Sequence, residues 1–520
     1  RGRARRTDQI PFGEQAARAE QARQQRTMSG ADDAEWNAAF ADAIKDIHGR
    51  CDFHEGAEML RTLVKTKLLR FDDLEGNPER FFRAHRMLLA PRQIPEQSGF
   101  GVRFTVQYNL FAGSILSLGD ESQREMLNTF QERGVLGCFC LTEAFAGVNS
   151  GLVVHTTATW DKSSQRFIIT CENAGARKNW ISQGLTATHA VVIANLRIDG
   201  KFYGPHGFVV EIRNPETGEL HAGVSVEDMG VKTTANDLDN ARINFDNFSV
   251  GREALLRRFA DVQDDKYVQT TKDRMRIEIL GQRLLTGRLA IAQASCNFGK
   301  ALFTQTKAYA DNKVCWAPKG QAPPKLSEVP HIAAIFREGE EKLDTLSRYA
   351  AAVETRLCEV LRTRAIPDLD LVEAIAVAKI QCVQTPITLL NKLVREVGSY
   401  ALSYDSGFGN IQWLLMCQFA EGDTRILMQK LARDSMKAYQ KSSWTDAGKD
   451  IVFGTSAEQQ EMKVRFQLSR ALSAAATPQD AGRLWNENYE LVYELANAVC
   501  ARHISKAIGD ESRQVLFAKL

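Results

Sequence analysis

Long apolar runs, paired cysteines and clustered histidines are all scarce in this sequence of 520 residues. No uninterrupted apolar stretch approaches the roughly 20 residues needed to cross a bilayer, so we expect no membrane partner. The nine histidines form neither an HExxH nor an HxH motif, and we predict no bound metal. The formal net charge is only +2, which gives no electrostatic basis for a nucleic-acid partner.

The ten cysteines include no C-x-x-C pair. In so long a chain this usage indicates a reducing compartment rather than a disulfide framework. Cys138 and Cys140 form a lone C-x-C, which at strand spacing places both thiols on one face. We interpret them as small buried apolar residues rather than metal ligands.

The two ends of the chain carry possible address signals. Residues 1–27 hold seven arginines against three acidic residues, and we expect a disordered basic tail before a plausible start at Met28. Such a leader is either a mitochondrial transit signal or sequence added upstream of that start. Ala518-Lys519-Leu520 is a conservative variant of the Ser-Lys-Leu peroxisomal address. We therefore expect a peroxisome or a glycosome-type organelle, with the mitochondrion as the alternative.

Hydrophobic periodicity divides the chain into helical, strand and helical sections, which predicts an α+β fold. Segments rich in Val, Ile and Thr fill the middle, and Asp199-Gly200 between two of them predicts a hairpin. A helical pattern resumes at about residue 255 and runs to about 312. Strands do not alternate with helices, which argues against a dinucleotide-binding Rossmann fold. The predicted units are the tail 1–27, a helical domain 28–135, a β domain 136–254, a helical bundle 255–445 and a helical extension 446–520.

Four segments, in order along the chain, carry more specific patterns. They are GCFCLTEAFAGVNSG at 137–151, KNWISQGLTATHAVVIANL at 178–196, EDMGVKTTANDLDNARINFDN at 227–247 and FAEGDTRILMQKLAR at 419–433. Together they resemble the flavin and active-site signatures of the acyl-CoA oxidase and acyl-CoA dehydrogenase superfamily, and the likeness is nearer to the oxidases. The resemblance covers roughly residues 30 to 440.

This resemblance implies an acyl-CoA dehydrogenase-like fold. Its parts are an N-terminal helical domain, a central small β-barrel or sandwich, a C-terminal helical bundle and a short extra helical extension. It also implies FAD as cofactor, an acyl-CoA thioester as substrate, and a homodimer or homotetramer. The matching flavin contacts are Thr142 and Gly147 in the first segment and Trp180 and Ser182 in the second.

Glu421 is the position that the resemblance identifies as the catalytic base, which would take the α-proton of the thioester. Its neighbours Phe419, Ala420 and Gly422 suit an apolar cleft that raises a carboxylate pKa. The ordinary alternative is a carboxylate placed near a helix N-terminus, where negative charge is favoured. Asp423 is a further expected cofactor contact.

Two expected cofactor contacts depart from the family pattern. Lys313 stands where dehydrogenases carry an arginine that reaches the FAD of a partner subunit, and a lysine meets a pyrophosphate as a point charge. The family's Gly-rich segment before the catalytic glutamate is blurred here, and its spacing to Glu421 favours Gly398.

Three functions remain open from the sequence. The first is an acyl-CoA oxidase of fatty-acid β-oxidation, in which oxygen reoxidises the flavin and yields hydrogen peroxide. The second is an acyl-CoA dehydrogenase that passes electrons to an electron-transfer flavoprotein. The third is a helical scaffold that kept the fold and lost the cofactor. The changes around Lys313 favour the scaffold, whereas the intact Thr142 and Glu421 segments oppose it.

Overall fold

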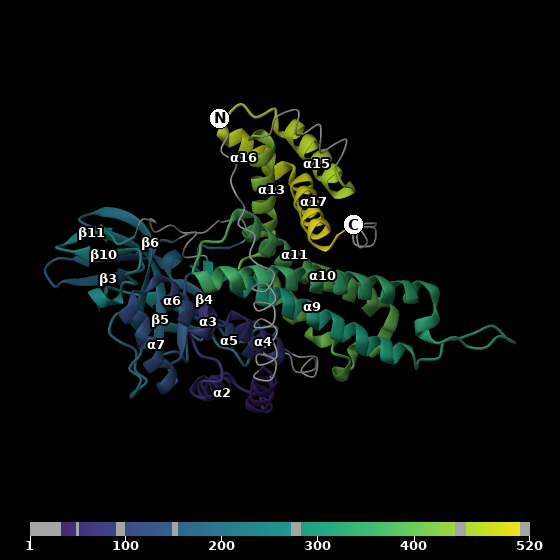
Figure 1. Cartoon of the computed structure of the whole chain (residues 1–520), viewed down its shortest axis with the longest axis horizontal. Helices are drawn as coiled ribbons and strands as arrows, with labels where there is room; N and C mark the ends of the chain where they lie inside the picture. The colour runs from purple at the N-terminus through teal and green to yellow at the C-terminus, as the bar shows by residue number, and fades with distance from the viewer. Residues whose placement is uncertain are drawn as a thin grey trace, which may run out of the picture.

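The computed structural model describes residues 33–47, 51–89, 99–147, 154–271, 282–441 and 454–509. The strand region lies at one end of the molecule, and long helices extend from it as a bundle (Figure 1). A second group of helices rises from the bundle on one side. The basic tail and the C-terminal tripeptide discussed above lie outside the described residues.

The N-terminal part is helical. Residues 33–43 are followed by α2 (Phe53–Lys65), α3 (Asp73–Gly76), α4 (Pro78–Leu88), α5 (Phe100–Thr105), α6 (Gly113–Leu118) and α7 (Glu121–Arg133). Between α5 and α6 the helix widens into a fully buried π-helical turn, η2 (Val106–Ala112). Such π-bulges are rare and occur frequently at functional sites.

The central strands form two sheets and a hairpin. They are β1 (Gly137–Cys140), β2 (Thr157–Asp161), β3 (Arg166–Thr170), β4 (Lys178–Ser182), β5 (His189–Ile198), β6 (Lys201–Glu211), β7 (Val224–Asp228), β8 (Asn240–Phe245), β9 (Phe248–Gly251), β10 (Ala260–Gln263) and β11 (Lys266–Gln269). The larger sheet runs β1-β5-β2-β3-β9, with β6 paired to β5. The smaller sheet runs β4-β8-β7. The predicted α+β class is confirmed.

The hairpin predicted at Asp199-Gly200 is confirmed, because β5 pairs antiparallel with β6 across these two residues. Both residues have positive φ angles, 51° and 76°, as a tight two-residue turn requires.

The helical pattern predicted from residue 255 is wrong over its first part. Residues 260–269 form the antiparallel hairpin β10–β11, and its turn is Asp264-Asp265, where φ is 48° and 60°. The carboxylates tolerate this left-handed turn, which breaks a helix.

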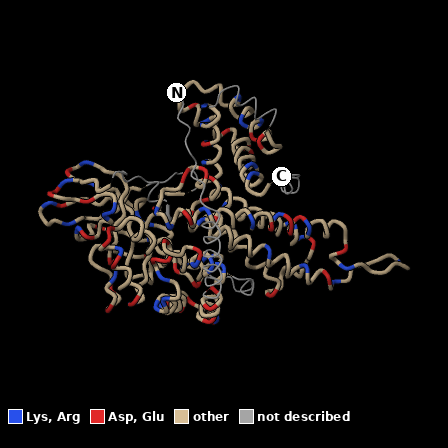
Figure 2. Tube along the Cα trace, viewed as in Figure 1, with Lys and Arg blue, Asp and Glu red and all other residues tan. Residues whose placement is uncertain are grey.

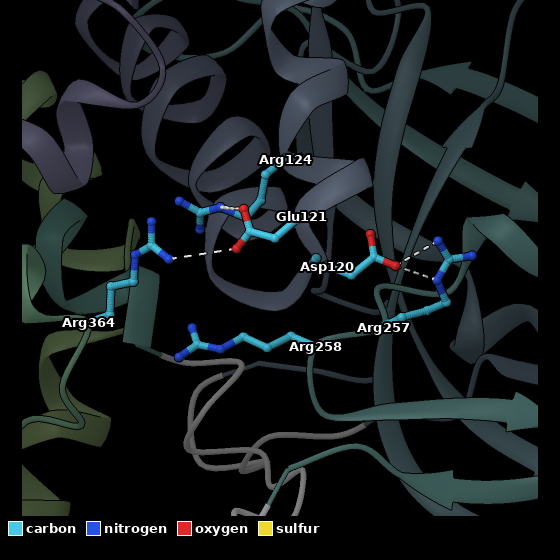
Figure 3. Close-up of a pocket in the computed structure, with 7 residues that line it drawn as sticks. Asp120, Glu121, Arg124, Arg257, Arg258 and Arg364 are labelled. Atoms are coloured by element: carbon cyan, nitrogen blue, oxygen red, sulfur yellow. Dashed lines mark hydrogen bonds and ion pairs between the residues drawn. The ribbon is translucent and has the colours of Figure 1, made fainter.

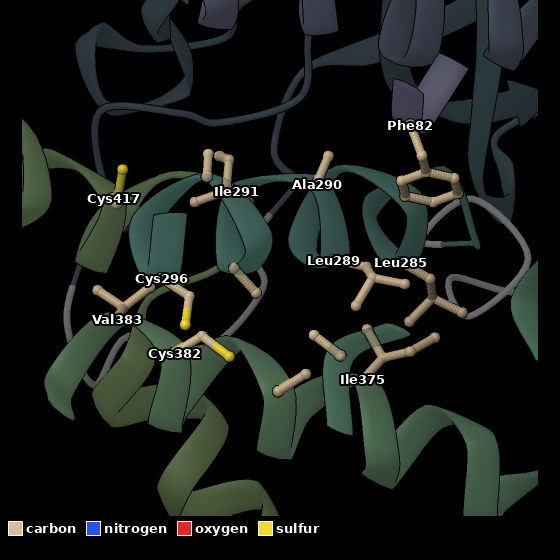
Figure 4. Packing of buried hydrophobic residues seen from close by; sticks show 14 of the residues in the cluster. Phe82, Leu285, Leu289, Ala290, Ile291, Cys296, Ile375, Cys382, Val383 and Cys417 are labelled. Carbon is tan, nitrogen blue, oxygen red and sulfur yellow. The ribbon is translucent and has the colours of Figure 1, made fainter. Parts of the chain in front are cut away.

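The C-terminal helices are α9 (Gln282–Ala310), α10 (Pro330–Thr363), α11 (Leu369–Val397), α12 (Ile411–Phe419), α13 (Thr424–Lys441), α15 (Ser456–Leu472), α16 (Pro478–Glu487) and α17 (Tyr489–Ile508). Figure 4 shows α9 packing its apolar face on α11, where Leu289 lies close to Ile375. The side chains of Cys296 and Cys382 meet in the same layer. α9 is therefore a central helix of the bundle.

One continuous hydrophobic core unites the N-terminal and C-terminal helices, because Phe40, Phe82 and Phe104 belong to the same buried cluster as Leu289 and Leu390. The strands enclose a second core. Among the described residues, no helix combines the length and apolar character that a membrane span requires. Lys and Arg are interspersed with Asp and Glu along the described chain (Figure 2).

Candidate active site

Glu421 lies in the short turn between α12 and α13, against the middle helix of the bundle. Its backbone has φ 58°, and Gly422 follows with φ 104°. A non-glycine residue seldom adopts this left-handed conformation. A Cβ added to Gly287 of α9 would meet the Glu421 carboxyl carbon at 2.4 Å. The carboxylate therefore rests directly on the backbone of α9, in space that only glycine leaves open.

Burial perturbs the Glu421 carboxylate strongly. Desolvation raises its pKa to about 7, against the opposing effects of Arg288 and Lys379. Its Oε2 atom is buried and has no hydrogen-bond partner among the residues that the structure describes. A buried acceptor normally has a partner, so this oxygen is available to a group supplied from outside the chain. A carboxylate with a pKa near 7 is suited to general-base catalysis.

An acidic residue in this turn could simply stabilise the N-terminus of α13. Asp423, and not Glu421, has that role. Its Oδ1 accepts hydrogen bonds from the backbone N–H groups of Arg425 (2.7 Å) and Ile426 (3.2 Å). Asp423 thus caps α13 in the usual manner. Its expected contact with a cofactor remains a prediction.

Thr142, Trp180 and Ser182 come together at the edge of the small sheet. The Asn179 N–H donates to the Thr142 carbonyl at 2.9 Å, which joins the two predicted flavin segments. The register of β4 shifts between Lys178 and Ile181, and Trp180 lies in this bulge with φ 58°. Bulges re-aim side chains beside active sites. The Trp180 ring is 56% exposed, which leaves an open aromatic surface.

Ser182 is held in this region by Asn240 of β8, whose Nδ2 donates to the Ser182 Oγ at 3.2 Å. Gly147 is exposed and ends the described part of the first motif. Phe145, just before it, is 60% exposed and covers Gly175, where an added Cβ would strike its ring. Exposed aromatic side chains thus gather beside Thr142.

Glu143 of the first motif is fully buried and has a structural role. Its carboxylate pairs with the Lys178 ammonium at 2.9 Å, and both side chains are fully buried. It also accepts hydrogen bonds from the N–H groups of His155 (2.7 Å) and Thr156 (2.9 Å). The lysine and these donors lower the Glu143 pKa despite burial. This carboxylate fixes both ends of the loop that carries Gly147.

Hydrogen bonds made by two glutamine side chains connect the start of β1 to the π-helical turn η2. The Gly137 N–H donates to the Gln107 side-chain oxygen at 2.9 Å. The Gln183 amide donates to the Gly137 carbonyl at 2.8 Å. Gly137 also packs on the Phe111 ring of η2. Since η2 packs against both β1 and α9, it links the Thr142 and Trp180 edge to the helix that supports Glu421.

Lys313 and Gly398 lie elsewhere, beyond the C-terminal end of α9. Tyr309 near that end stacks on Tyr400 with ring centroids 3.8 Å apart, which brings the segment of Gly398 beside the start of the loop that carries Lys313. At 1.5 Å per residue, Gly287 and Ala310 are about 35 Å apart along α9. One chain therefore holds the predicted site residues in two separate groups, and the loop after α9 projects from the far end of the bundle (Figure 1).

Sequence reasoning missed three residues around Glu421. These are Gly287, on which the carboxylate rests, Arg288, whose Nε donates to the Glu421 carbonyl at 2.7 Å, and Lys379. The Lys379 ammonium is fully buried and donates to the carbonyls of Gln418 and Gly422. The only available signal was a lysine within the apolar pattern of α11 and a Gly-Arg pair within that of α9.

A pocket of about 280 Å³ opens where α7 begins, away from the predicted site residues (Figure 3). It is lined by Gly119, Asp120, Glu121, Arg124, Arg257, Arg258 and Arg364. Arg257 pairs with Asp120 at 2.7 Å, while Arg124 and Arg364 each pair with Glu75 at 2.8 Å. These arginines already have carboxylate partners, so we interpret the pocket as a junction joining α7, the strand region and the end of α10.

The chain is similar in sequence to curated acyl-CoA oxidases. It is 30% identical to the acyl-coenzyme A oxidase of Saccharomyces cerevisiae over 392 residues, which cover 70% of this chain and 51% of that protein. It is 33% identical to the human peroxisomal acyl-coenzyme A oxidase 3 over 223 residues, which cover 41% of this chain and 32% of that protein. The chain spans about half the length of the first of these relatives. No protein-family model matches it.

Solved structures share the fold. The acyl-CoA oxidase-2 of Caenorhabditis elegans, bound with FAD, ascaroside-CoA and ATP, superposes with a TM-score of 0.74 at 19% identity and covers 93% of this chain and 78% of that one. The acyl-CoA oxidase1 of Yarrowia lipolytica gives a TM-score of 0.67 at 21% identity, over 88% of this chain and 72% of that one. The acyl-CoA dehydrogenase-like fold expected from the motifs is confirmed.

Proposed function

Because the chain is a member of the acyl-CoA dehydrogenase and oxidase superfamily with acyl-CoA oxidases as its relatives, we propose that it is an FAD-dependent acyl-CoA oxidase. It removes one hydrogen each from Cα and Cβ of an acyl-CoA thioester and releases the trans-2-enoyl-CoA. Oxygen is the final acceptor, and hydrogen peroxide is the second product. This is the first step of a fatty-acid β-oxidation cycle.

The observation that carries the proposal is the Glu421 carboxylate with its raised pKa and its buried, unpartnered Oε2. An α-proton of a thioester is weakly acidic, so its removal needs a desolvated base held at a fixed place. Glu421 supplies that base, and Gly287 lets it approach without a clash. The half-exposed ring of Phe419 beside it offers apolar surface to an acyl chain.

The residues around Thr142 fit a bound flavin. Trp180 and Phe145 are exposed aromatic side chains, and a planar ring system such as isoalloxazine stacks favourably on such surfaces. The Thr142 hydroxyl, the Gly147 turn and the Ser182 hydroxyl supply hydrogen-bonding groups at the same edge. When bound, FAD accepts the hydride from Cβ. The residues of this chain would hold the thioester so that its α-proton faces the Glu421 carboxylate.

We further propose that the active form is a homodimer, or a tetramer built from such dimers. Lys313 and Gly398 lie near the C-terminal end of α9, about 35 Å along that helix from Gly287, in a group separate from the one that contains Thr142. Near them, Trp316 is 84% exposed and Leu402 is 87% exposed. Exposed apolar side chains at the end of a helical bundle are typical of a protein–protein interface, here with a second copy of this chain. In such an assembly, Lys313 of one copy would supply positive charge to the cofactor phosphates of the other.

The peroxisome is the proposed location. The human relative and the acyl-coenzyme A oxidase 2 of Arabidopsis thaliana are both named as peroxisomal. A hydrogen-peroxide-forming reaction is consistent with that compartment.

The visible spectrum of the purified protein is the first test of this function. We expect flavin absorption that acyl-CoA bleaches without oxygen, and hydrogen peroxide equal to the enoyl-CoA formed when oxygen is present. Turnover only with electron-transfer flavoprotein would favour a dehydrogenase. A colourless protein that takes up no FAD would support the scaffold.

Substitution of Glu421 by Gln tests the base. We expect Glu421→Gln to keep FAD and bind acyl-CoA, but to lose turnover by at least about 1,000-fold, because the amide takes up no proton. Glu340→Gln, in which an exposed glutamate of α10 loses its charge, is the matched control and retains full activity. Wild-type rates in Glu421→Gln would remove this residue from the mechanism.

A further inference from the structure

Lys379 is an unusual buried cation next to the proposed base. It lies on the inner face of α11 with no exposed surface. Its two described hydrogen bonds go to main-chain carbonyls, those of Gln418 (3.2 Å) and Gly422 (3.0 Å). A buried ammonium is costly unless its donors are satisfied. Its retention inside the bundle therefore requires a structural or catalytic reason.

The two carbonyls that Lys379 binds lie on either side of Glu421 in the chain. The ammonium thus joins the end of α12 to the residue after the base, and closes the turn that contains Glu421. The Arg288 Nε holds the Glu421 carbonyl itself at 2.7 Å. The left-handed conformation of Glu421, with φ 58°, is unfavourable for a glutamate and persists only where surrounding contacts impose it.

Charged and titratable groups from each neighbouring element act on Lys379. They are Arg288 on α9, Cys417 on α12, and Glu421 and Asp423 in the turn. Burial lowers the Lys379 pKa to about 7, while its positive charge opposes the rise of the Glu421 pKa. The side chain is therefore placed to affect both where the base is held and how readily it ionises.

We propose that Lys379 is a positioning residue, which ties Gln418 to Gly422 and so holds the Glu421 carboxylate against Gly287. This inference deepens the proposed function and rests on it. Lys379 touches neither the acyl-CoA nor the cofactor in this role, and it acts through the turn.

The test compares Lys379→Met with Lys379→Gln in the FAD-loaded enzyme. Met fills similar space without donors, and we expect kcat to fall about 100-fold, as a small displacement of a catalytic group does, while KM changes little. The acidic limb of the pH–kcat/KM profile should move up by about one pH unit, because a nearby positive charge has been removed. Lys379→Gln keeps a neutral donor, so its kcat should recover in part while the limb stays shifted.

Lys342→Met is the matched control. Lys342 is also buried, at 8% exposure, but it lies on α10 and pairs with Glu338 at 2.9 Å. We expect this variant to keep the wild-type kcat and pH profile. A purely structural loss of packing does not move the acidic limb, so the limb shows whether the charge of Lys379 acts on Glu421. The partial recovery of kcat in Lys379→Gln tests whether the hydrogen-bond tie holds the base.

Wild-type kcat and an unshifted limb in both Lys379 variants would overturn the inference while leaving the proposed function intact. An inactive wild-type protein would instead contradict the proposed function. In that case, amide hydrogen exchange of residues 417–424 still tests whether Lys379 holds the turn between α12 and α13. Faster exchange in Lys379→Met than in Lys342→Met supports it, and equal exchange overturns it.

Discussion

A carboxylate that takes a proton from carbon must be partly desolvated and must stay in one place, and Glu421 meets both needs through its neighbours. Burial raises its pKa to about 7, while Gly287 gives the carboxyl group its resting place. The motif identified Glu421 from sequence alone. The supporting residues Gly287, Arg288 and Lys379 are about 40 to 135 positions away in the chain, so only the packing of α9 and α11 reveals them.

Gly287→Ala tests whether the proposed base, Glu421, must rest against the α9 backbone. An added methyl group would overlap the Glu421 carboxyl carbon, 2.4 Å away, and must displace it. We expect kcat to fall at least about 30-fold, with the flavin spectrum retained. Gly482→Ala is the control, since its added Cβ meets nothing within 4 Å. Unchanged kinetics in Gly287→Ala would show that the carboxylate moves without cost.

The raised pKa of Glu421 also predicts a pH-dependent stability. The folded state holds the proton more tightly than the unfolded state, so wild-type stability decreases as pH rises from about 4.5 to about 7. Glu421→Gln has no such proton. Its free energy of unfolding should exceed that of the wild type by up to roughly 3 kcal/mol at pH 8, and the gap should close near pH 4.5. Urea unfolding across this pH range measures it, and a gap that grows as pH falls would contradict the assignment.

At the scale of elements, the sequence predicts the turns and helices that have a strong local cause. It does not predict the features that tertiary packing imposes. The hairpin at Asp199-Gly200 and the helix after Gly422 follow directly from turn residues and apolar spacing. The hairpin at 260–269 was misread as helix, because its alternation is short and lies next to a long helical run. The π-helical turn at 106–112 and the bulge at Trp180 have no sequence signature, since tertiary contacts create both.

The buried Glu143–Lys178 ion pair holds the two ends of the loop between β1 and β2. Removing the lysine from this pair should destabilise the protein. Lys178→Met leaves a buried carboxylate without its cation, and we expect a loss of about 3–5 kcal/mol in the free energy of unfolding. FAD content should fall with it, because the same loop carries Gly147.

The double variant Glu143→Gln/Lys178→Met should recover part of that stability, since no isolated buried charge remains. Urea unfolding of the two variants measures the difference. If the double variant is less stable than Lys178→Met, the penalty does not come from the unpaired carboxylate.

At the scale of the whole molecule, the two groups of predicted cofactor residues argue for an assembly. Lys313 and Gly398 lie at the far end of α9 from Gly287, and the exposed side chains of Trp316 and Leu402 lie near them in the chain. The sequence pattern predicts both positions, but it gives no indication that about 35 Å of helix separates them from the residues that contact the proposed base, Glu421. That separation is a property of the packed bundle.

Leu402→Asp tests the assembly. Leu402 is 87% exposed, and burying a carboxylate there against a second copy is unfavourable. Sedimentation analysis should find monomers in this variant, and its FAD content should fall. Leu369→Asp, at the first residue of α11, which is 79% exposed, should keep the wild-type mass. If the Leu402→Asp variant has the same oligomeric mass as the wild type, the interface between copies does not include Leu402.

The shared core of the first and last helices has a consequence for biosynthesis. Phe82 and Phe104 pack in the same core as Leu289. The entire strand region is synthesised after the two phenylalanines and before Leu289. The nascent N-terminal helices therefore carry uncovered apolar faces through much of translation, and they cannot complete their packing until α9 and α11 have emerged. A product that ends within α9 is therefore expected to expose the apolar faces of its N-terminal helices and to aggregate.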